Sequence, residues 1–135
     1  MKVVIDTNVL LSSLPVTSES HLIFLSLIQD RFKLCITSDI LNEYEEVFQQ
    51  RANSAVAEYA LDLFDILPNI ILVKKYYFWQ LIQSDPDDNK FVDCAIASNA
   101  DYIITDDKHF KVLASIGFPK VNVLSKQEFL TLLST

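Results

Sequence analysis

A chain of 135 residues has the size of one globular domain, and because half of its residues are apolar and only one is glycine, disordered and low-complexity classes are excluded. The net charge of −7 argues against the broad basic face that nonspecific DNA binding needs. The apolar runs are too short to cross a bilayer and MKVVID lacks the apolar core of a signal peptide, so we expect a single domain over residues 1–135 in the cytoplasm.

The first half of the chain alternates between strand and helix patterns. The predicted elements are, in chain order, a strand at 2–6, a helix at 20–29, a strand at 32–36 and helices at 39–51 and 54–67. Thr37-Ser38-Asp39 supplies capping residues for the helix at 39–51, and Pro68 stops the helix that begins near Asn53 or Ser54.

The second half continues the alternation. Its predicted elements are a strand at 70–73, a helix after the polar break at 84–89, a strand at 101–105, a short helix at 108–117, a strand at 121–124 and a helix at 125–134. Residues 74–84 are ambiguous; within them we expect Phe78 and Trp79 in the core, an exposed patch being the alternative. The alternation predicts an α/β domain with a mostly parallel central sheet covered on both faces.

Acids follow two of the predicted strands. Asp6 ends the first strand, and Asp106 and Asp107 follow the strand at 101–105. In parallel sheets, sites gather beyond the carboxyl ends of the strands, so we expect these acids at one edge. A local cap or turn is the alternative role of Asp6. Because Asp106 and Asp107 are adjacent, at most one should face Asp6; the other, and His109, are expected to be solvated or locally hydrogen bonded.

The helix at 39–51 offers a choice between two glutamates. At 100° per residue, Glu43 and Glu45 border the apolar arc on opposite sides, whereas Glu46 points further away. The helical wheel does not show which of Glu43 and Glu45 belongs to a site. For both, the alternative is a solvated position at the edge of the apolar face.

Asp93 is the acid with the least obvious role. It lies among Phe91, Val92, Cys94 and Ala95, and no Lys or Arg stands one turn ahead of it to form an ion pair. A buried carboxylate needs a partner or a cation, so we expect Asp93 to have a function. Three further acids are expected to cap the helix or break the chain before it: Asp85, Asp87 and Asp88.

Converging carboxylates without Cys or His clusters are suited to hard cations such as Mg²⁺ or Mn²⁺, which can assist phosphodiester cleavage. Such a cluster makes a small protein acidic, so the net charge does not exclude a nucleic-acid enzyme. With one glycine there is no phosphate-binding loop of the P-loop kind. Cys35 and Cys94 are expected to be ordinary buried thiols.

Three segments in this order resemble the PIN-domain family, and within it the toxin components of bacterial toxin–antitoxin pairs. They are IDTN (5–8), TSDILNEYEEVF (37–48) and DPDDNKFVDCAIASNADYIITDDKHF (85–110). The resemblance implies a three-layer α/β/α fold and spans the whole chain. The chain departs from the family at Asp106, where relatives often carry Gly, and at His109, where they often carry an acid.

The resemblance assigns the site. It implies catalytic and metal-binding roles for Asp6, Glu43, Asp93 and Asp107, which resolves the choice of glutamate, with Thr7 and Asn8 in support and Asn8 as a hydrogen-bond donor to a site carboxylate. It further implies cleavage of single-stranded RNA with Mg²⁺ or Mn²⁺ as cofactor, a homodimer, and an antitoxin that holds toxin members inactive. By this reading Asp93→Asn abolishes cleavage.

Three lysines are candidates for substrate contacts, and two other functional classes remain as alternatives. Lys90, Lys108 and Lys111 lie near the expected site and are candidates for phosphate contacts. One alternative is a catalytically inactive PIN-like interaction module. Another is an aspartyl-phosphate phosphatase that uses Asp6, although such enzymes carry an acid where this chain has Asn8.

Overall fold

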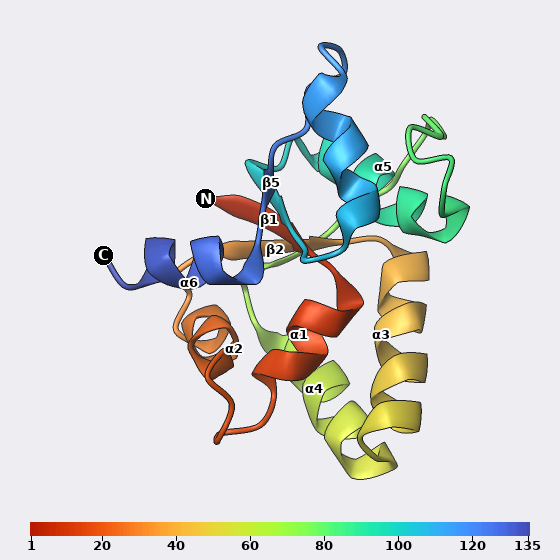
Figure 1. Ribbon diagram of the computed structural model, residues 1–135. Coiled ribbons are helices and arrows are strands. Elements are labelled where there is room, and N and C mark those ends of the chain that lie inside the picture. Colours follow the sequence, from red (N-terminus) through yellow and green to blue (C-terminus); the bar gives the residue numbers. More distant parts are fainter.

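The computed structural model describes residues 1–135 and is built around a sheet of five parallel strands (Figure 1). The strand order is β3-β2-β1-β4-β5. The strands are β1 (Lys2–Ile5), β2 (Lys33–Ile36), β3 (Ile70–Leu72), β4 (Tyr102–Ile104) and β5 (Val123–Leu124). All five predicted strands are confirmed, and the sheet, expected to be mostly parallel, is parallel throughout.

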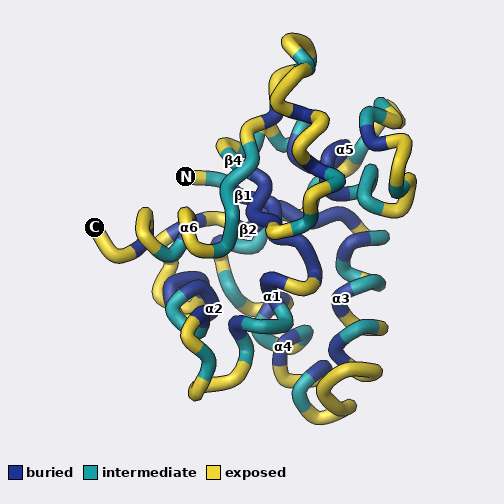
Figure 2. Tube along the Cα trace, viewed as in Figure 1, coloured by how far each residue is buried: buried dark blue, intermediate teal, exposed yellow.

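The central strands are buried on both faces. Val3, Val4 and Ile5 of β1 have no exposed surface, and the tube view shows β1 and β2 within the buried interior (Figure 2). A strand covered on both sides needs apolar residues at every position, which is why β1 is a continuous apolar run rather than an alternating one.

Helices form the two outer layers. They are α1 (Thr7–Ser13), α2 (His21–Ile28), α3 (Ser38–Arg51), α4 (Ser54–Ile66), α5 (Asn89–Ser98) and α6 (Lys126–Leu133), with 3₁₀ helices η1 (Pro86–Asp88) and η2 (Lys108–Ser115). Helix α5 packs on β1, β2 and β4, while α1, α2 and α4 lie on the opposite side of the sheet (Figure 1). The predicted three-layer α/β/α arrangement is therefore confirmed.

Helix ends follow the capping residues in the sequence. The Thr37 hydroxyl accepts a hydrogen bond from the Ile40 amide, and the Asn53 side chain accepts one from the Val56 amide at 2.8 Å. Each cap of this kind contributes about 1 kcal/mol. Helix α4 ends at Ile66, two residues before Pro68. The predicted starts of α3 and α4 are thus correct to within one residue.

Helix α1 was not predicted. Its seven residues, TNVLLSS, are too few to show a helical period clearly, and IDTN reads equally well as a turn. The structure begins α1 immediately after β1, which makes Asp6 the N-cap residue. The Asp6 side chain makes no capping bond, so its carboxylate is free for contacts beyond the helix.

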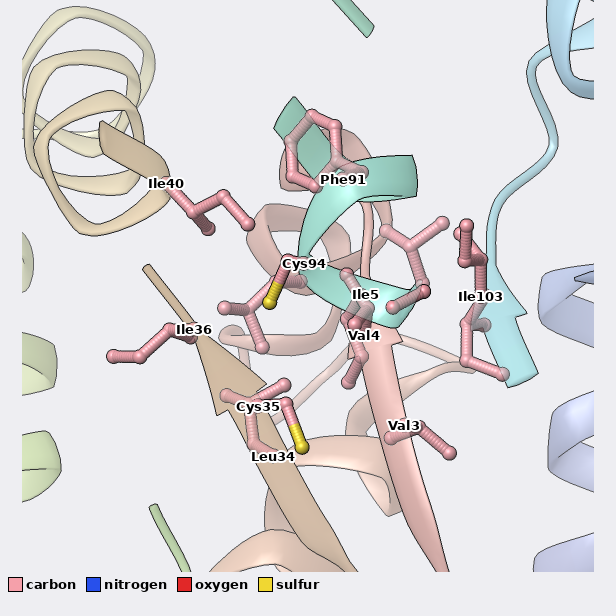
Figure 3. Packing of buried hydrophobic residues seen from close by; sticks show 14 of the residues in the cluster. Val3, Val4, Ile5, Leu34, Cys35, Ile36, Ile40, Phe91, Cys94 and Ile103 are labelled. Atoms are coloured by element: carbon pink, nitrogen blue, oxygen red, sulfur yellow. The ribbon is translucent and has the colours of Figure 1, made fainter. Parts of the chain in front are cut away.

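One apolar core runs from the sheet into α5. Phe91 and Cys94 of α5 face Ile5 of β1, with Ile40 of α3 beside them (Figure 3). Cys94 and Cys35 are both fully buried and free, as predicted.

Residues 73–85 connect β3 to η1 without helix or strand. The expectation that Phe78 lies in the core is wrong: its side chain is 67% exposed, and Trp79 is only partly buried. The segment runs along the outside of the molecule, so its aromatic residues have little core to enter. Nowhere in the structure does a helix combine the length and the apolar character that crossing a membrane requires.

Candidate acidic active site

The carboxyl ends of β1 and β4 bring Asp6 and Asp107 together. Ile5 pairs with Ile104 in the sheet, and the Asp6 amide continues the ladder by donating to the Ile104 carbonyl at 2.9 Å. The buried Thr105 then connects the two acids. Its hydroxyl donates to Asp6 Oδ2 at 2.7 Å and accepts from the Asp107 amide at 3.0 Å.

Asp6 lies in a repulsive environment. Burial raises the pKa of its carboxyl, the Thr105 hydrogen bond lowers it, and the negative charges of Asp107 and Glu43 raise it again, leaving the pKa above its ordinary value. The carboxylates of Asp107 and Glu43 are therefore close enough to act on Asp6. A cation between such groups would offset their repulsion.

Glu43 faces this group from α3. Its Oε2 accepts from the Thr7 hydroxyl, and its Oε1 accepts from Lys90 Nζ at 2.6 Å. Lys90 also lies 3.1 Å from an Asp87 carboxylate oxygen, so its ammonium is already engaged by two acids. Glu45 is exposed on α3. Of the two glutamates that the helix wheel left open, Glu43 is the one that points toward Asp6.

A second group of side chains surrounds Asp107. Asp85, Asp88, Asp107 and His109 each place a ligand atom within 4.8 Å of the others. His109 Nδ1 lies 3.1 Å from Asp107 Oδ1, 3.6 Å from Asp88 Oδ2 and 3.7 Å from Asp85 Oδ2. The expected local hydrogen bond is present, because the His109 amide donates to Asp107 Oδ1 at 2.9 Å, but the prediction missed that the His109 ring nitrogen lies among three carboxylates.

Asp88 is the most perturbed carboxyl of this group. Burial, followed by the negative charges of Asp107, Asp85 and Asp6, raises the pKa of Asp88 to about 7. It stands at the N-cap position of α5, yet its side chain makes no capping hydrogen bond. Asp88 Oδ2 is buried without a hydrogen-bond partner, as is Nδ1 of His109. The predicted capping role does not describe this side chain.

The structure does not bring Asp93 to the other acids. Its Oδ1 accepts from the Trp79 amide at 3.1 Å. Burial raises the pKa of Asp93, the Trp79 hydrogen bond and Lys75 lower it, and Asp39 raises it again, leaving the pKa above its ordinary value. The partner that compensates this carboxylate in an apolar helix is thus a backbone amide.

Helix geometry explains why Asp88, rather than Asp93, reaches the site. A helix between parallel strands runs back against them, so its N-terminus lies at the carboxyl edge of the sheet. Asp93 is five residues further along α5, which at about 1.5 Å and 100° per residue moves it about 7.5 Å away and turns it by about 140°. In the sequence, the three aspartates of DPDD directly before a predicted helix are the signal that could have identified Asp88.

The two remaining predicted residues, Asn8 and Asp106, make contacts outside the group of site carboxylates. Asn8 Oδ1 accepts from Arg51 Nη1 at 2.9 Å, and no hydrogen bond joins Asn8 to a site carboxylate. Asp106 Oδ1 accepts from the Lys126 amide at 2.9 Å, so the two adjacent aspartates do point in different directions, as expected. A pocket of about 340 Å³ is lined by Asp6, Asn8, Val9, Ser12, Asp106, Asp107 and Lys126.

The donor set fits a divalent cation. Carboxylate oxygens suit Mg²⁺ or Mn²⁺, and the partnerless buried oxygen of Asp88 is a donor that such an ion would satisfy. In chemical terms, the edge of the sheet can hold a cation and position a polyanionic substrate beside it.

Comparisons with known proteins agree with this architecture. A family model described as PIN domain matches residues 2–109. Among solved structures, the chain is similar in fold to one described as "VapBC2 from Rickettsia felis bound to a DNA fragment from their promoter". The TM-score is 0.63 and the identity 20%, over 93% of this chain and 98% of that one. No match was found among curated proteins.

Proposed function

The chain belongs to the PIN-domain family, and on that premise we propose that it is a Mg²⁺- or Mn²⁺-dependent endoribonuclease that cleaves single-stranded RNA. One observation carries the proposal: Thr105 joins Asp6 to Asp107 at the carboxyl edge of the sheet, and Asp88 and Asp107 place ligand atoms within 4.8 Å of each other. The mutual repulsion of such carboxylates destabilises a protein unless a ligand compensates it.

We assign the metal and the catalytic chemistry to Asp6, Glu43, Asp88 and Asp107. This set keeps three of the four acids that the family resemblance implied and replaces Asp93 with Asp88. These residues would hold a divalent cation, which when bound would supply positive charge to the phosphate oxygens and lower the pKa of a water nucleophile. His109 adds a ring nitrogen within reach of the same carboxylates.

The other residues of the site orient these acids. Thr105 fixes Asp6 by donating to one of its oxygens, and Thr7 and Lys90 hold the two oxygens of Glu43. A carboxylate held in one orientation loses less conformational freedom when a metal or substrate binds. We therefore assign Thr7 a supporting role that acts through Glu43.

We extend the proposal to a toxin component of a toxin–antitoxin pair, in the cytoplasm, with an antitoxin partner and a homodimer as its assembly. Support comes from the similarity in fold to VapBC2, whose structure was solved on promoter DNA. The family resemblance of the sequence points the same way.

The test is to titrate Mn²⁺ by calorimetry and to follow cleavage of single-stranded RNA on the same samples. The wild type should bind Mn²⁺ at up to millimolar concentration and cut RNA, and Asp107→Asn should lose both. Asp62→Asn, which removes an exposed acid on α4, is the matched control and should change neither. A wild type that binds no Mn²⁺ would instead favour the inactive interaction module.

A further inference from the structure

Five aromatic residues, which we call the aromatic platform, lie outside the core: Tyr76, Tyr77, Phe78, Trp79 and Phe118. Four of them are between 67% and 85% exposed, and Trp79 is partly buried. Trp79 joins the two segments of the platform, with its ring centroid 6.0 Å from that of Tyr77 and 6.5 Å from that of Phe118. Exposed apolar groupings of this kind mark sites of interaction.

The two sequence segments that carry the platform contain lysines and no acids, although in space Asp39 pairs with Lys75 and Asp93 accepts a hydrogen bond from the Trp79 amide. No Asp or Glu occurs between Asp65 and Asp85 or between Asp107 and Glu128, although the protein has 18 acidic residues. The same two segments carry six of the 11 basic residues: Lys74, Lys75, Lys108, Lys111, Lys120 and Lys126. A protein with a net charge of −7 has thus kept acids out of these segments, which makes them complementary to a polyanion.

Both segments of the platform are connected to the acidic site through short stretches of chain. The segment that holds Trp79 is fastened to α5 by Asn89, whose side chain accepts from the Ile82 amide at 2.9 Å and donates to the Ile82 carbonyl at 2.8 Å. Asn89 directly follows Asp88. Phe118 lies just beyond η2, which begins next to Asp107. Figure 1 shows residues 116–120 at the tip of this blue helix, with the green segment before α5 at the same end of the molecule.

We propose that the aromatic platform binds single-stranded RNA by stacking bases on Tyr77, Trp79 and Phe118 while the surrounding lysines contact its phosphates. The proposal rests on the proposed function, because it supplies the substrate path of that site. The eight residues of η2 span about 16 Å at roughly 2.0 Å per residue, which about five stacked nucleotides cover at ~3.4 Å each. Stacking on aromatic rings is tolerant of sequence and is typical of single-strand binding.

A second copy of the chain is the competing occupant, and the charges disfavour it. In a two-fold dimer the same patch faces itself, so Lys74 and Lys120 would lie near their own copies without acids to offset them. Of the nearby lysines, Lys75 has an acidic partner, Asp39, at 2.6 Å, while its ammonium stands 5.2 Å from the ring centre of Phe78. A phosphate chain supplies the missing negative charge.

Trp79 is the only tryptophan of the protein, so its fluorescence reports directly on the platform. The first experiment adds an oligouridylate of about 15 nucleotides, within the reach of single-strand sites, to the full chain in chelator, where no cleavage occurs. Saturable quenching that weakens with salt is expected. Phe118→Leu and Tyr77→Leu should each weaken binding roughly tenfold, since an aliphatic side chain cannot stack, whereas Phe118→Tyr and Tyr77→Phe should bind as the wild type does.

Tyr59→Leu is the control, because Tyr59 is a comparably exposed aromatic residue on α4, outside the platform. The proposal is overturned if the wild type shows no quenching, if the Leu variants bind as tightly as the Tyr and Phe variants, or if Trp79 emission and sedimentation change with protein concentration alone, which would identify a dimer interface.

A second experiment separates this proposal from the proposed function. With Mn²⁺ present, Phe118→Leu should raise KM for the long substrate about tenfold and leave KM unchanged for a substrate of about four nucleotides, too short to reach the platform. Cleavage without quenching would refute the platform and keep the nuclease. Quenching without cleavage under any divalent cation would refute the nuclease and keep the platform.

Discussion

Asp88→Asn and Asp93→Asn form a pair of substitutions that separates the two candidate third acids. Both remove one negative charge, Asp88 at the N-cap of α5 and Asp93 within it, and Asn is close to Asp in volume. Asp88 acts on Asp6 and Asp107, so its substitution should abolish cleavage. Asp93 accepts only a backbone amide, which an Asn oxygen can also do, so its substitution should leave cleavage within about twofold of the wild type.

The same pair predicts unequal effects on stability, and the size of the larger effect follows from the pKa of Asp88. A rise from 3.8 to about 7 corresponds to about 4 kcal/mol at ~1.4 kcal/mol per pKa unit. Because the folded-state pKa is the higher one, the folded protein holds the proton more tightly. Its stability is therefore full below about pH 4 and falls as the pH rises through about 7.

Urea unfolding in chelator measures this effect. At about pH 8, Asp88→Asn should be more stable than the wild type by up to about 4 kcal/mol, and at about pH 4 the two should be nearly equal. Asp93→Asn should gain less at about pH 8, because the Trp79 hydrogen bond and Lys75 offset part of the rise that burial causes in the pKa of Asp93. Equal stability of Asp88→Asn and the wild type at the higher pH would show that the carboxylates do not repel one another, and retained cleavage in Asp88→Asn would refute its place in the site.

Two further substitutions test the groups that orient the acids. Thr105→Val keeps the shape of the buried side chain but removes the donor to Asp6 and the acceptor for the Asp107 amide. Thermal unfolding should show that the protein loses about 1–3 kcal/mol of stability, and calorimetry should show a weaker affinity for Mn²⁺. An unchanged affinity would count against the orienting role of Thr105. Lys90→Met removes the cation beside Glu43, so cleavage assays should show a lower kcat with KM little changed; a rise in KM alone would make Lys90 a phosphate contact instead.

The fold was predictable because its strands carry a strong local signal. Val, Ile and Leu runs such as KVVI can be satisfied only by a sheet covered on both faces, and the capping residues Thr37 and Asn53 stand where helices begin. Helix α1 was not predicted because it is short. The burial of Phe78 was predicted wrongly because hydrophobicity indicates that a side chain favours the core but not whether its segment of chain lies near the core.

The site was predictable only where the topology determines position. Asp6 and Asp107 end neighbouring parallel strands, so their proximity follows from the strand order. The third acid depends on which turn of α5 meets the edge, and apolar neighbours around Asp93 suggested burial without indicating its partner. His109 was missed for a related reason: sequence separation hides the carboxylates of Asp85 and Asp88 that lie beside it.

The total net charge is likewise a poor guide to what the local surface can bind. A value of −7 argues against a basic face when charges are spread evenly, but here they are segregated along the chain. Three acids of one cluster, Asp85, Asp88 and Asp107, share a small volume, where a divalent cation would cancel much of their charge. The segments on either side of that cluster, residues 66–84 and 108–127, carry lysines and no acids. An RNA strand would therefore interact with the positive charge of these two segments and with the metal ion in the site. For this reason an acidic total charge is compatible with a polyanionic substrate.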